Sequence, residues 1–376
     1  MTRFVVAERA TLRGEGLGNE MIPWAKGFIA SQVLNAHLVG PSWGLNPRKY
    51  YRNFQTGRLD FVLEDVLKHL PHHEFTYEDY LSTGEVDFGR AIAKWAAIEG
   101  ILKRRTFVVT VGGMWGGYPS IRSARPFLWA KLLNSRDAMR NVYEIASKLD
   151  RGKLFVAVHM RFGSEFAVVG DGDNPRGKIN VQIPGEWYLS LCESLRNEMG
   201  DRVQFHFFTD RGGPAFDEAV RRYNPGQIEQ AGLTECSDLL LMSMADLRIC
   251  SISSYSLMAS FLSDGLYIWY EPQLTYTDGM YTLWGMENAQ RMKRSPTSQS
   301  VDLMKTIEPG SPWETAFKGY AMGTGSTMPR GLVEQLHRKL LANDRSASLL
   351  EYGCLPDWTM ASLHARSLTS CPGIKS

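Results

Sequence analysis

The chain has 376 residues, a length that predicts two domains at roughly 100–200 residues each. Hydrophobic residues make up 44% and charged residues 22%, and a formal net charge of +2 gives no electrostatic reason to expect a nucleic-acid partner. The five cysteines are odd in number and none are spaced as C-x-x-C, so neither a disulfide framework nor a thiolate metal site is expected.

The first ten residues lack the long apolar core of a signal peptide, and no run reaches the 18 or so apolar residues that span a bilayer. Unpaired cysteines fit a reducing compartment. We therefore expect a soluble, cytoplasmic protein without a membrane span.

The chain opens with a short buried strand over 4–7 and a turn-rich segment over 13–19. Apolar residues at helical spacing then predict a helix over 21–36, with Asn19 as its N-cap and Pro23 in its first turn.

The rest of the N-terminal half is less regular. Strands are expected over 37–40 and 106–111, with mixed helix and loop over 44–100 between them. The glycine-rich run 112–117 then predicts a loop that could face a ligand.

Strands and helices alternate in the second half, which predicts a parallel, doubly wound sheet that binds ligands beyond the carboxyl ends of its strands. The expected strands cover 154–159, 203–209, 227–230, 247–252 and 266–270. The expected helices cover 187–199, 216–223, 237–245 and 254–262.

A charged segment near 149–153 marks the expected domain boundary. The chain then divides into an acceptor-side domain over 1–150, a nucleotide-sugar domain over 151–300 and a tail over 301–376 with one helix near 331–343.

The first candidate motif is G-E-G-L-G-N over 14–19, at a predicted helix start that favours anions. A dinucleotide fingerprint is an alternative, but the glycine spacing differs and no acidic residue lies near 36–42. A turn with a helix cap is the other interpretation. The candidate residues are Glu15, Gly16, Gly18 and Asn19.

Two further motifs follow predicted strands. V-H-M-R-F-G-S-E places His159, Arg161 and Gly163 after one strand, where the donor fork of an arginine suits phosphate oxygens or a structural salt bridge. F-F-T-D places Asp210 after the next strand, where it could hold a hydroxyl or cap a helix.

The fourth motif runs from 237 to 256. Ser253, Ser254 and Ser256, with Tyr255 among them, lie where a strand gives way to a helix, so hydroxyls and free backbone N–H groups could cradle a diphosphate. Asp238 opens the preceding helix and could accept two N–H bonds from guanine, and both positions also suit helix caps. Cys250 is expected to be a small buried residue.

These four motifs, in this order, resemble those of the fucosyltransferase superfamily. G-L-G-N-E-M resembles the N-terminal glycine motif of that family, and H-M-R-F-G resembles its H-x-R-x-G motif. F-F-T-D resembles its apolar strand that ends in S/T-D, and the segment D-L-L-L-M-S-M-A-D-L-R-I-C-S-I-S-S-Y-S resembles the end of its donor site. The similarity covers residues 3–40 and 153–265.

The resemblance implies an α/β fold of the GT-B type, with two Rossmann-like doubly wound domains facing across a cleft. It implies GDP-fucose or another GDP-sugar as donor substrate, with no other cofactor and no metal. The acidic triplet D-G-D over 171–173 is therefore interpreted as a surface or acceptor loop. By motif position, the resemblance assigns the donor diphosphate to Arg161 and Ser254, guanine to His159 and Asp238, and a donor loop to Gly18 and Asn19.

An inverting displacement needs a base, for which Glu15 is the first choice and Asp171 and Glu165 are alternatives. Ser164–Glu165 replaces the Asp of many relatives, and Asn19–Glu20 replaces Asn-Gln, so the sugar, the linkage and the acceptor (a glycan, natural product or protein) stay open. The other possibilities are a different nucleotide-sugar donor, a non-catalytic glycan-binding relative and a nicotinamide-dependent oxidoreductase.

Overall fold

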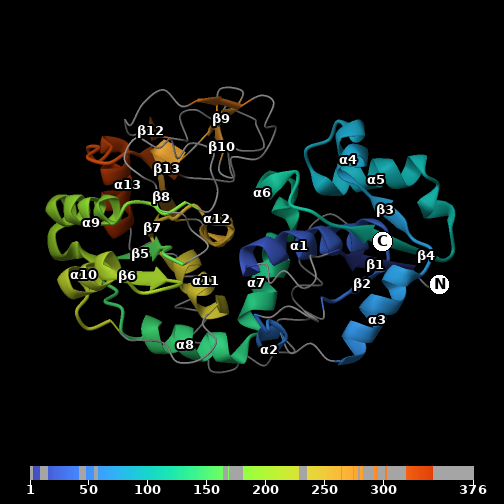
Figure 1. Cartoon of the computed structure of the whole chain (residues 1–376), viewed down its shortest axis with the longest axis horizontal. Coiled ribbons are helices and arrows are strands. Elements are labelled where there is room, and N and C mark those ends of the chain that lie inside the picture. The colour runs from blue at the N-terminus through green and yellow to red at the C-terminus, as the bar shows by residue number, and fades with distance from the viewer. Residues whose placement is uncertain are drawn as a thin grey trace. The chain divides into compact units, whose positions relative to one another are not determined.

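The computed structural model describes residues 3–8, 16–41, 48–54, 58–163, 168, 181–227, 235–263, 265–273, 275–277, 280–282, 292–294, 301–302 and 319–341. They form two compact units, which divide between Met139 and Arg140. Each unit is built on its own largely parallel sheet (Figure 1).

Unit 1 contains a four-stranded parallel sheet in the order β2-β1-β4-β3. Its strands are β1 (Arg3–Ala7), β2 (His37–Val39), β3 (His73–Phe75) and β4 (Phe107–Val111). The helices are α1 (Leu17–Val33), α2 (Tyr51–Phe54), α3 (Arg58–His69), α4 (Tyr77–Thr83), α5 (Phe88–Ile98), α6 (Gly117–Ser120), α7 (Arg125–Leu133) and α8 (Arg136–Ala146), the last of which crosses into unit 2.

Helix α1 begins earlier than the sequence predicted. Gly16 is its N-cap, in an extended conformation, and its carbonyl accepts the backbone N–H groups of Asn19 and Glu20 at 2.9 and 3.2 Å. Asn19 therefore lies in the first turn and not at the cap, and Pro23 lies inside the helix. The prediction was wrong because it required a side-chain cap, whereas the backbone alone starts this helix.

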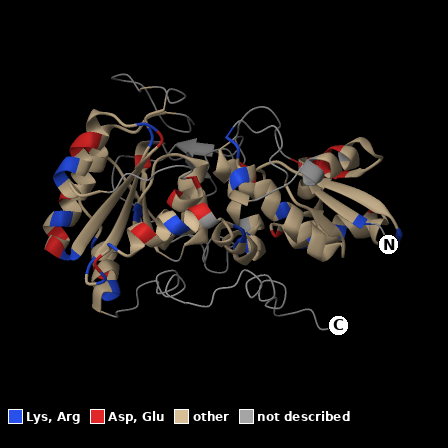
Figure 2. Ribbon diagram, turned by 90° about the horizontal axis from the view of Figure 1, so that it is seen from below, with Lys and Arg blue, Asp and Glu red and all other residues tan. Residues whose placement is uncertain are grey.

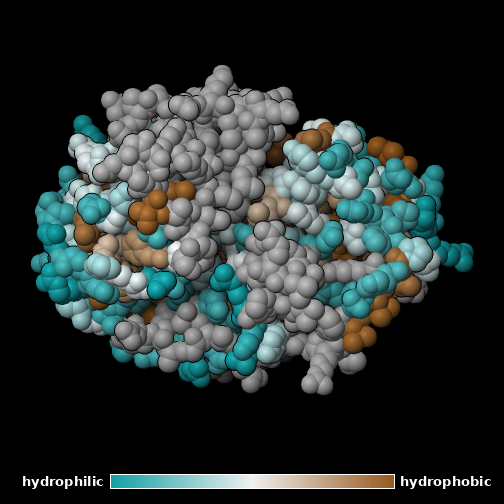
Figure 3. Space-filling view, in the orientation of Figure 1, coloured by the Kyte–Doolittle hydropathy of each residue, from teal (hydrophilic) through white to brown (hydrophobic). Residues whose placement is uncertain are grey.

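Helices α1 and α3 cover opposite faces of the unit 1 sheet. A side chain at Gly27 of α1 would meet Ala7 of β1, whereas Leu67 of α3 packs with Val6 of the same strand. Helix α3 exposes Val62 and Val66, and Leu70 is exposed just after its end. Figure 3 shows apolar surface in the region of α3.

Unit 2 contains a six-stranded sheet in the order β12-β13-β8-β7-β5-β6, parallel except for the pair β12–β13. Its strands are β5 (Leu154–Met160), β6 (Val203–Thr209), β7 (Leu247–Ile249), β8 (Leu266–Tyr270), β12 (Val301–Asp302) and β13 (Gly319–Met322). A separate antiparallel sheet contains β9 (Thr275–Thr277), β10 (Met280–Thr282) and β11 (Met292–Arg294).

The helices of unit 2 lie on both faces of its sheet (Figure 1). They are α9 (Gly185–Met199), α10 (Pro214–Tyr223), α11 (Glu235–Met244), α12 (Ser254–Leu262) and α13 (Arg330–Leu341). This arrangement and the parallel sheets confirm the predicted α/β, doubly wound class. Of the expected strand over 227–230, Gln227 follows a turn and the other three residues lie outside the described part of the chain.

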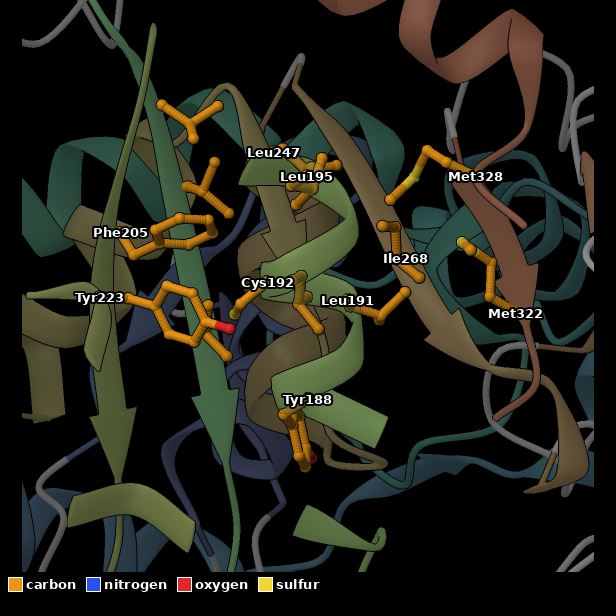
Figure 4. Close-up of a cluster of buried hydrophobic side chains, with 14 of the residues drawn as sticks. Tyr188, Leu191, Cys192, Leu195, Phe205, Tyr223, Leu247, Ile268, Met322 and Met328 are labelled. Carbon is orange, nitrogen blue, oxygen red and sulfur yellow. The ribbon is translucent and has the colours of Figure 1, made fainter. Parts of the chain in front are cut away.

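One face of the unit 2 sheet packs against α9, α10 and α13. Figure 4 shows Leu191 and Leu195 of α9 against residues of several strands, including Phe205 and Ile268. The charged residues of α9 and α10 lie on the outer sides of these helices (Figure 2). Alternation along β5 sends Val158 into this core and His159 to the opposite face, toward α12.

Strand order reverses between β5 and β7. The chain leaves β5 through α9 and returns as β6 on one side, whereas it leaves β7 through α12 and returns as β8 on the other side. The two connections diverge, so a crevice is expected at the carboxyl ends of β5 and β7.

The buried Arg248 of β7 ties together the elements that meet at the opposite edge of the sheet, just before β7 and β8 begin. Its guanidinium donates to the backbone oxygens of Met242, Ala245 and Gly265 at 3.3, 3.1 and 2.7 Å, and to Ser263 Oγ at 2.6 Å. The end of α11, the end of α12 and the start of β8 are thereby linked through one side chain.

We predict that Arg248→Ala lowers the free energy of unfolding by at least about 3 kcal/mol, because several buried carbonyl groups lose their donors. Urea denaturation would measure the change. Arg330→Ala is the matched control, because the side chain of Arg330 is 93% exposed and its loss should cost within about 0.5 kcal/mol. A loss under about 1 kcal/mol for Arg248→Ala would contradict the structural role.

Candidate functional site

Arg161 lies directly after β5 and is held by residues from two other strand ends. Its Nε atom lies 2.9 Å from Oδ2 of Asp210, which follows β6, and its Nη1 donates to Ser253 Oγ at 3.2 Å. The other oxygen of Asp210 accepts the backbone N–H of Phe162 at 3.0 Å. The carboxylate of Asp210 therefore fixes both the side chain of Arg161 and the backbone that follows it.

The arginine and its partner are only partly covered. The side chains of Arg161 and Asp210 are 17% and 24% exposed, so solvent or a ligand can reach them. An ion pair at this depth is screened less than a surface pair, and it orients the planar guanidinium.

Ser253 is the N-cap of α12. Its hydroxyl oxygen accepts the backbone N–H of Tyr255 at 3.1 Å in addition to the bond from Arg161. Since both lone pairs of that oxygen are used, the hydroxyl hydrogen is available as a donor. Together with the first N–H groups of the helix, it makes this edge of unit 2 suited to an anion.

His159 is buried on the face of β5 that looks toward α12. Its Nδ1 lies 2.6 Å from Ser256 Oγ and 3.0 Å from Ser251 Oγ. Burial, and then the positive charge of Arg161, lower the pKa of His159 well below its usual value. The imidazole is therefore neutral at neutral pH.

Of the two serines that hold His159, Ser256 was a sequence candidate, but for a diphosphate cradle and not for a histidine, and Ser251 was not predicted. Ser251 lies two residues after β7, and Ser256 lies in the first turn of α12. Their position just after a strand was the available signal, but pairing with a histidine more than 90 residues away is set by the fold.

Tyr255 joins the starts of α11 and α12. Its ring centroid lies 5.5 Å from that of His159, and its hydroxyl donates to the backbone oxygen of Glu235 at the start of α11. Asp238 lies half-buried in the first turn of that helix. The helix starts that carry Asp238 and Ser254 are thus linked by one side chain.

Some of the remaining predicted residues lie in the described part of the chain and others lie outside it. Gly163 is buried close after Arg161, and Cys250 is buried as expected, with its pKa raised to about 11 by burial. Gly16, Gly18 and Asn19 lie at the start of α1 in unit 1. Outside the described residues lie the three base candidates Glu15, Glu165 and Asp171.

No group of three or more His, Cys, Asp or Glu side chains that could hold a metal ion occurs in the described ranges. No helix within those ranges is long and apolar enough to cross a membrane.

The chain was compared with known proteins. No family model and no curated protein matches it. Among solved structures, it is similar to POFUT1 in complex with GDP-fucose, at 12% identity and a TM-score of 0.42, over 70% of this chain and 95% of that one. It is also similar to NodZ alpha-1,6-fucosyltransferase soaked with GDP-fucose, at 13% identity and a TM-score of 0.42, over 70% of this chain and 93% of that one.

A third similar structure is the fucosyltransferase NodZ from Bradyrhizobium, at 16% identity and a TM-score of 0.39, over 70% of this chain and 94% of that one. The fold class and the site described above follow from the strands and side chains of this chain, and not from these likenesses.

The neutral state of His159 predicts a pH-dependent stability. Its folded pKa lies below the unfolded value near 6.5, so the stability it contributes is present above that pH and is lost as the pH falls toward the folded pKa. The free energy of unfolding should fall by about 1.4 kcal/mol per pH unit for this group.

His159→Asn should remove that slope below pH 6.5, as measured by urea denaturation from pH 8 to pH 5. His206, whose pKa burial lowers to about 4, contributes its own slope to both proteins and so cancels in the comparison. His69→Asn is the control, because the side chain of His69 is 78% exposed. An unchanged slope in His159→Asn would mean that His159 does not resist protonation.

Proposed function

We propose that this chain is a glycosyltransferase that moves a sugar, fucose in this proposal, from a GDP-sugar to an acceptor hydroxyl with inversion and without a metal. The observation that supports it most is the position of Arg161, held by Asp210 and Ser253 at the strand reversal of unit 2 and beside the start of α12. The motif resemblance to fucosyltransferases points to the same residues.

The reaction requires stabilisation of the negative charge that develops on the leaving group. As the bond between the anomeric carbon and the diphosphate breaks, GDP gains negative charge that needs donors already in place. Arg161 supplies N–H donors and Ser253 supplies a hydroxyl hydrogen, and both lie beside the start of α12 at Ser254, where the end of a helix favours an anion. Each charge-assisted bond contributes roughly 1.5–3 kcal/mol.

The guanine base of the donor nucleotide is assigned to the starts of α11 and α12. Asp238 would accept two N–H bonds from the Watson–Crick edge of guanine, and the neutral His159 would contact the same base. Tyr255 supports this assignment, because it packs near His159 and fixes the start of the helix that carries Asp238.

The donor loop and the acceptor belong to the same proposal. Gly16, Gly18 and Asn19, at the start of α1, are the residues that the resemblance assigns to a donor loop. The acceptor would be a glycan, a natural product or a protein. Glu15, which the motif predicts, is the general base of this proposal.

Arg161→Ala should lower kcat/KM for GDP-fucose turnover by at least about 100-fold, because one preorganised donor to the leaving group is lost. Release of GDP, measured with a coupled assay, gives the rate. Arg221→Ala is the matched control, since Arg221 is 72% exposed and pairs with Glu218 within α10. A rate within about threefold of the wild-type protein would remove Arg161 from the diphosphate site.

Asp238→Asn should weaken GDP binding by about 5- to 150-fold, because a bidentate pair with a base edge is worth roughly 1–3 kcal/mol. Inosine diphosphate lacks the 2-amino group of guanine, so the preference of the protein for GDP over inosine diphosphate should fall sharply in this variant. Calorimetric titration measures both affinities.

Asp217→Asn provides the control for this substitution. Asp217 is likewise an acidic residue in the first turn of a helix, but it lies exposed on α10. If Asp238→Asn kept the full preference for GDP over inosine diphosphate, Asp238 would not contact guanine.

A further inference from the structure

His159 meets two serine hydroxyls through a single ring nitrogen. Its Nδ1 lies 2.6 Å from Ser256 Oγ and 3.0 Å from Ser251 Oγ, and the two hydroxyl oxygens lie 3.4 Å apart. None of the three side chains is more than 5% exposed. The three groups therefore have to satisfy one another's hydrogen-bonding capacity.

A lone pair on Nδ1 would leave one of these contacts without a hydrogen. A ring nitrogen of a neutral imidazole carries either one hydrogen or one lone pair, so a bare Nδ1 could accept a hydrogen from only one serine. The oxygen of the other serine would then lie within 3.0 Å of that nitrogen with no hydrogen between them, and their lone pairs would repel. Donation by both serines would place two hydrogens on one lone pair.

A hydrogen on Nδ1 satisfies both contacts. One N–H can be shared between two oxygens in a three-centre bond, and each hydroxyl oxygen has two lone pairs. Ser251 can then donate to Ser256 Oγ, and Ser256 can donate to the thiol of Cys250, with which it is also hydrogen-bonded. Every hydrogen of the group thereby has an acceptor.

The fold keeps this group in place. The residue before Ser251 continues the sheet, because the backbone N–H of Cys250 donates to Ile268 O of β8 at 2.9 Å. The other serine lies in the first turn of α12, and its neighbour Tyr255 places its ring centroid 5.5 Å from that of His159. The imidazole is thus held by a strand end, a helix start and an aromatic ring.

The second ring nitrogen of His159, Nε2, then carries a lone pair. Burial, and then the positive charge of Arg161, lower the pKa of His159, so the ring stays neutral at neutral pH. Among the described residues, Nε2 has no hydrogen-bond partner. A lone pair at this position accepts N–H groups and repels carbonyl oxygens and bare ring nitrogens.

The edge of guanine has one group that matches this lone pair. In the proposed function, Asp238 takes the ring N–H of guanine and one hydrogen of its amino group. The second amino hydrogen is left, whereas the O6, N7 and N3 atoms of guanine are all acceptors.

We propose that Ser251 and Ser256 are positioning residues that hold the proton of His159 on Nδ1, so that the lone pair of Nε2 accepts the second amino hydrogen of guanine. The position of the proton is a property of the chain alone, whereas the contact with guanine rests on the proposed function.

Nuclear magnetic resonance measures the position of the proton without any nucleotide. In the full chain labelled with ¹⁵N-histidine, Nδ1 of His159 should have the chemical shift of a ring nitrogen that carries a hydrogen, and Nε2 that of a nitrogen that does not. His159→Asn identifies the two signals by their loss. The reverse pattern, or two signals averaged by exchange between the tautomers, would overturn the role of the serines.

Removal of both hydroxyls tests the contact with guanine. In the double variant Ser251→Ala, Ser256→Ala, the hydrogen on Nδ1 loses its acceptors, and the tautomer with the hydrogen on Nε2 becomes populated. The preference for GDP over inosine diphosphate, which lacks the amino group, should therefore fall at least about fivefold in calorimetric titrations.

Ser243→Ala is the matched control for the double variant. Ser243 is also a buried serine of unit 2, but its hydroxyl donates to the backbone oxygen of Leu239 within α11 at 2.7 Å. This variant should keep the preference for GDP within about twofold of the wild-type value.

The outcomes distinguish this proposal from the proposed function. An unchanged preference in the double variant, or an equal loss of affinity for GDP and inosine diphosphate, would overturn the contact between Nε2 and guanine and leave the proposed function standing. If the wild-type protein bound neither nucleotide, the proposed function would fail and the contact with it, whereas the resonance measurement would still decide the role of the serines.

Discussion

The reversal of strand order between β5 and β7 is the constraint on which the site depends. In a parallel sheet all strands end at one edge, but only at a reversal do the following connections diverge and leave that edge open. Arg161 follows β5 and Ser253 closes the segment after β7, so the reversal alone brings together residues 92 positions apart. Asp210 on the neighbouring strand end then fixes the orientation of the arginine.

The charged and polar groups of the site, and not the net charge of the whole chain, make the site suited to an anion. The formal net charge is +2, which attracts no particular ligand, yet Arg161 and the start of α12 place donors at one edge. Behind them lies a layer of buried polar side chains. Ser251 hydrogen-bonds to the buried His159 near the carboxyl ends of the strands. Arg248 is bonded to carbonyl and hydroxyl oxygens at the opposite edge of the sheet, where it holds the starts of β7 and β8.

Unit 2 was predictable because its elements are long and regular. The apolar run 203–209 and the helix 254–262 were predicted with the bounds that the structure has, since each is flanked by residues that end an element. Strand β3 was missed, because only Phe75 of its three residues is buried and no alternation can be read from so short a run. The start of α1 was misplaced because Gly16 caps it through its backbone.

Within the site, motifs predicted which residues matter but not how they are paired. Arg161 and Ser253 were both candidates, and their direct bond follows from the sheet topology. Asp210 was expected to hold a ligand hydroxyl or cap a helix, yet both of its oxygens are used by Arg161 and Phe162. Ser256 lies within the fourth motif, but its bond to His159 could not be predicted, because it depends on the packing of α12 against β5.

The most direct test of the account is calorimetric titration of the wild-type protein with GDP, UDP, dTDP and NAD under identical conditions. The account predicts that GDP binds selectively, because Arg161 and α12 hold the diphosphate while Asp238 and His159 select guanine. Preference for UDP or dTDP would contradict the assignment of Asp238 and His159 to guanine. Binding of NAD alone, or of none of the four nucleotides, would contradict the assignment of the whole site.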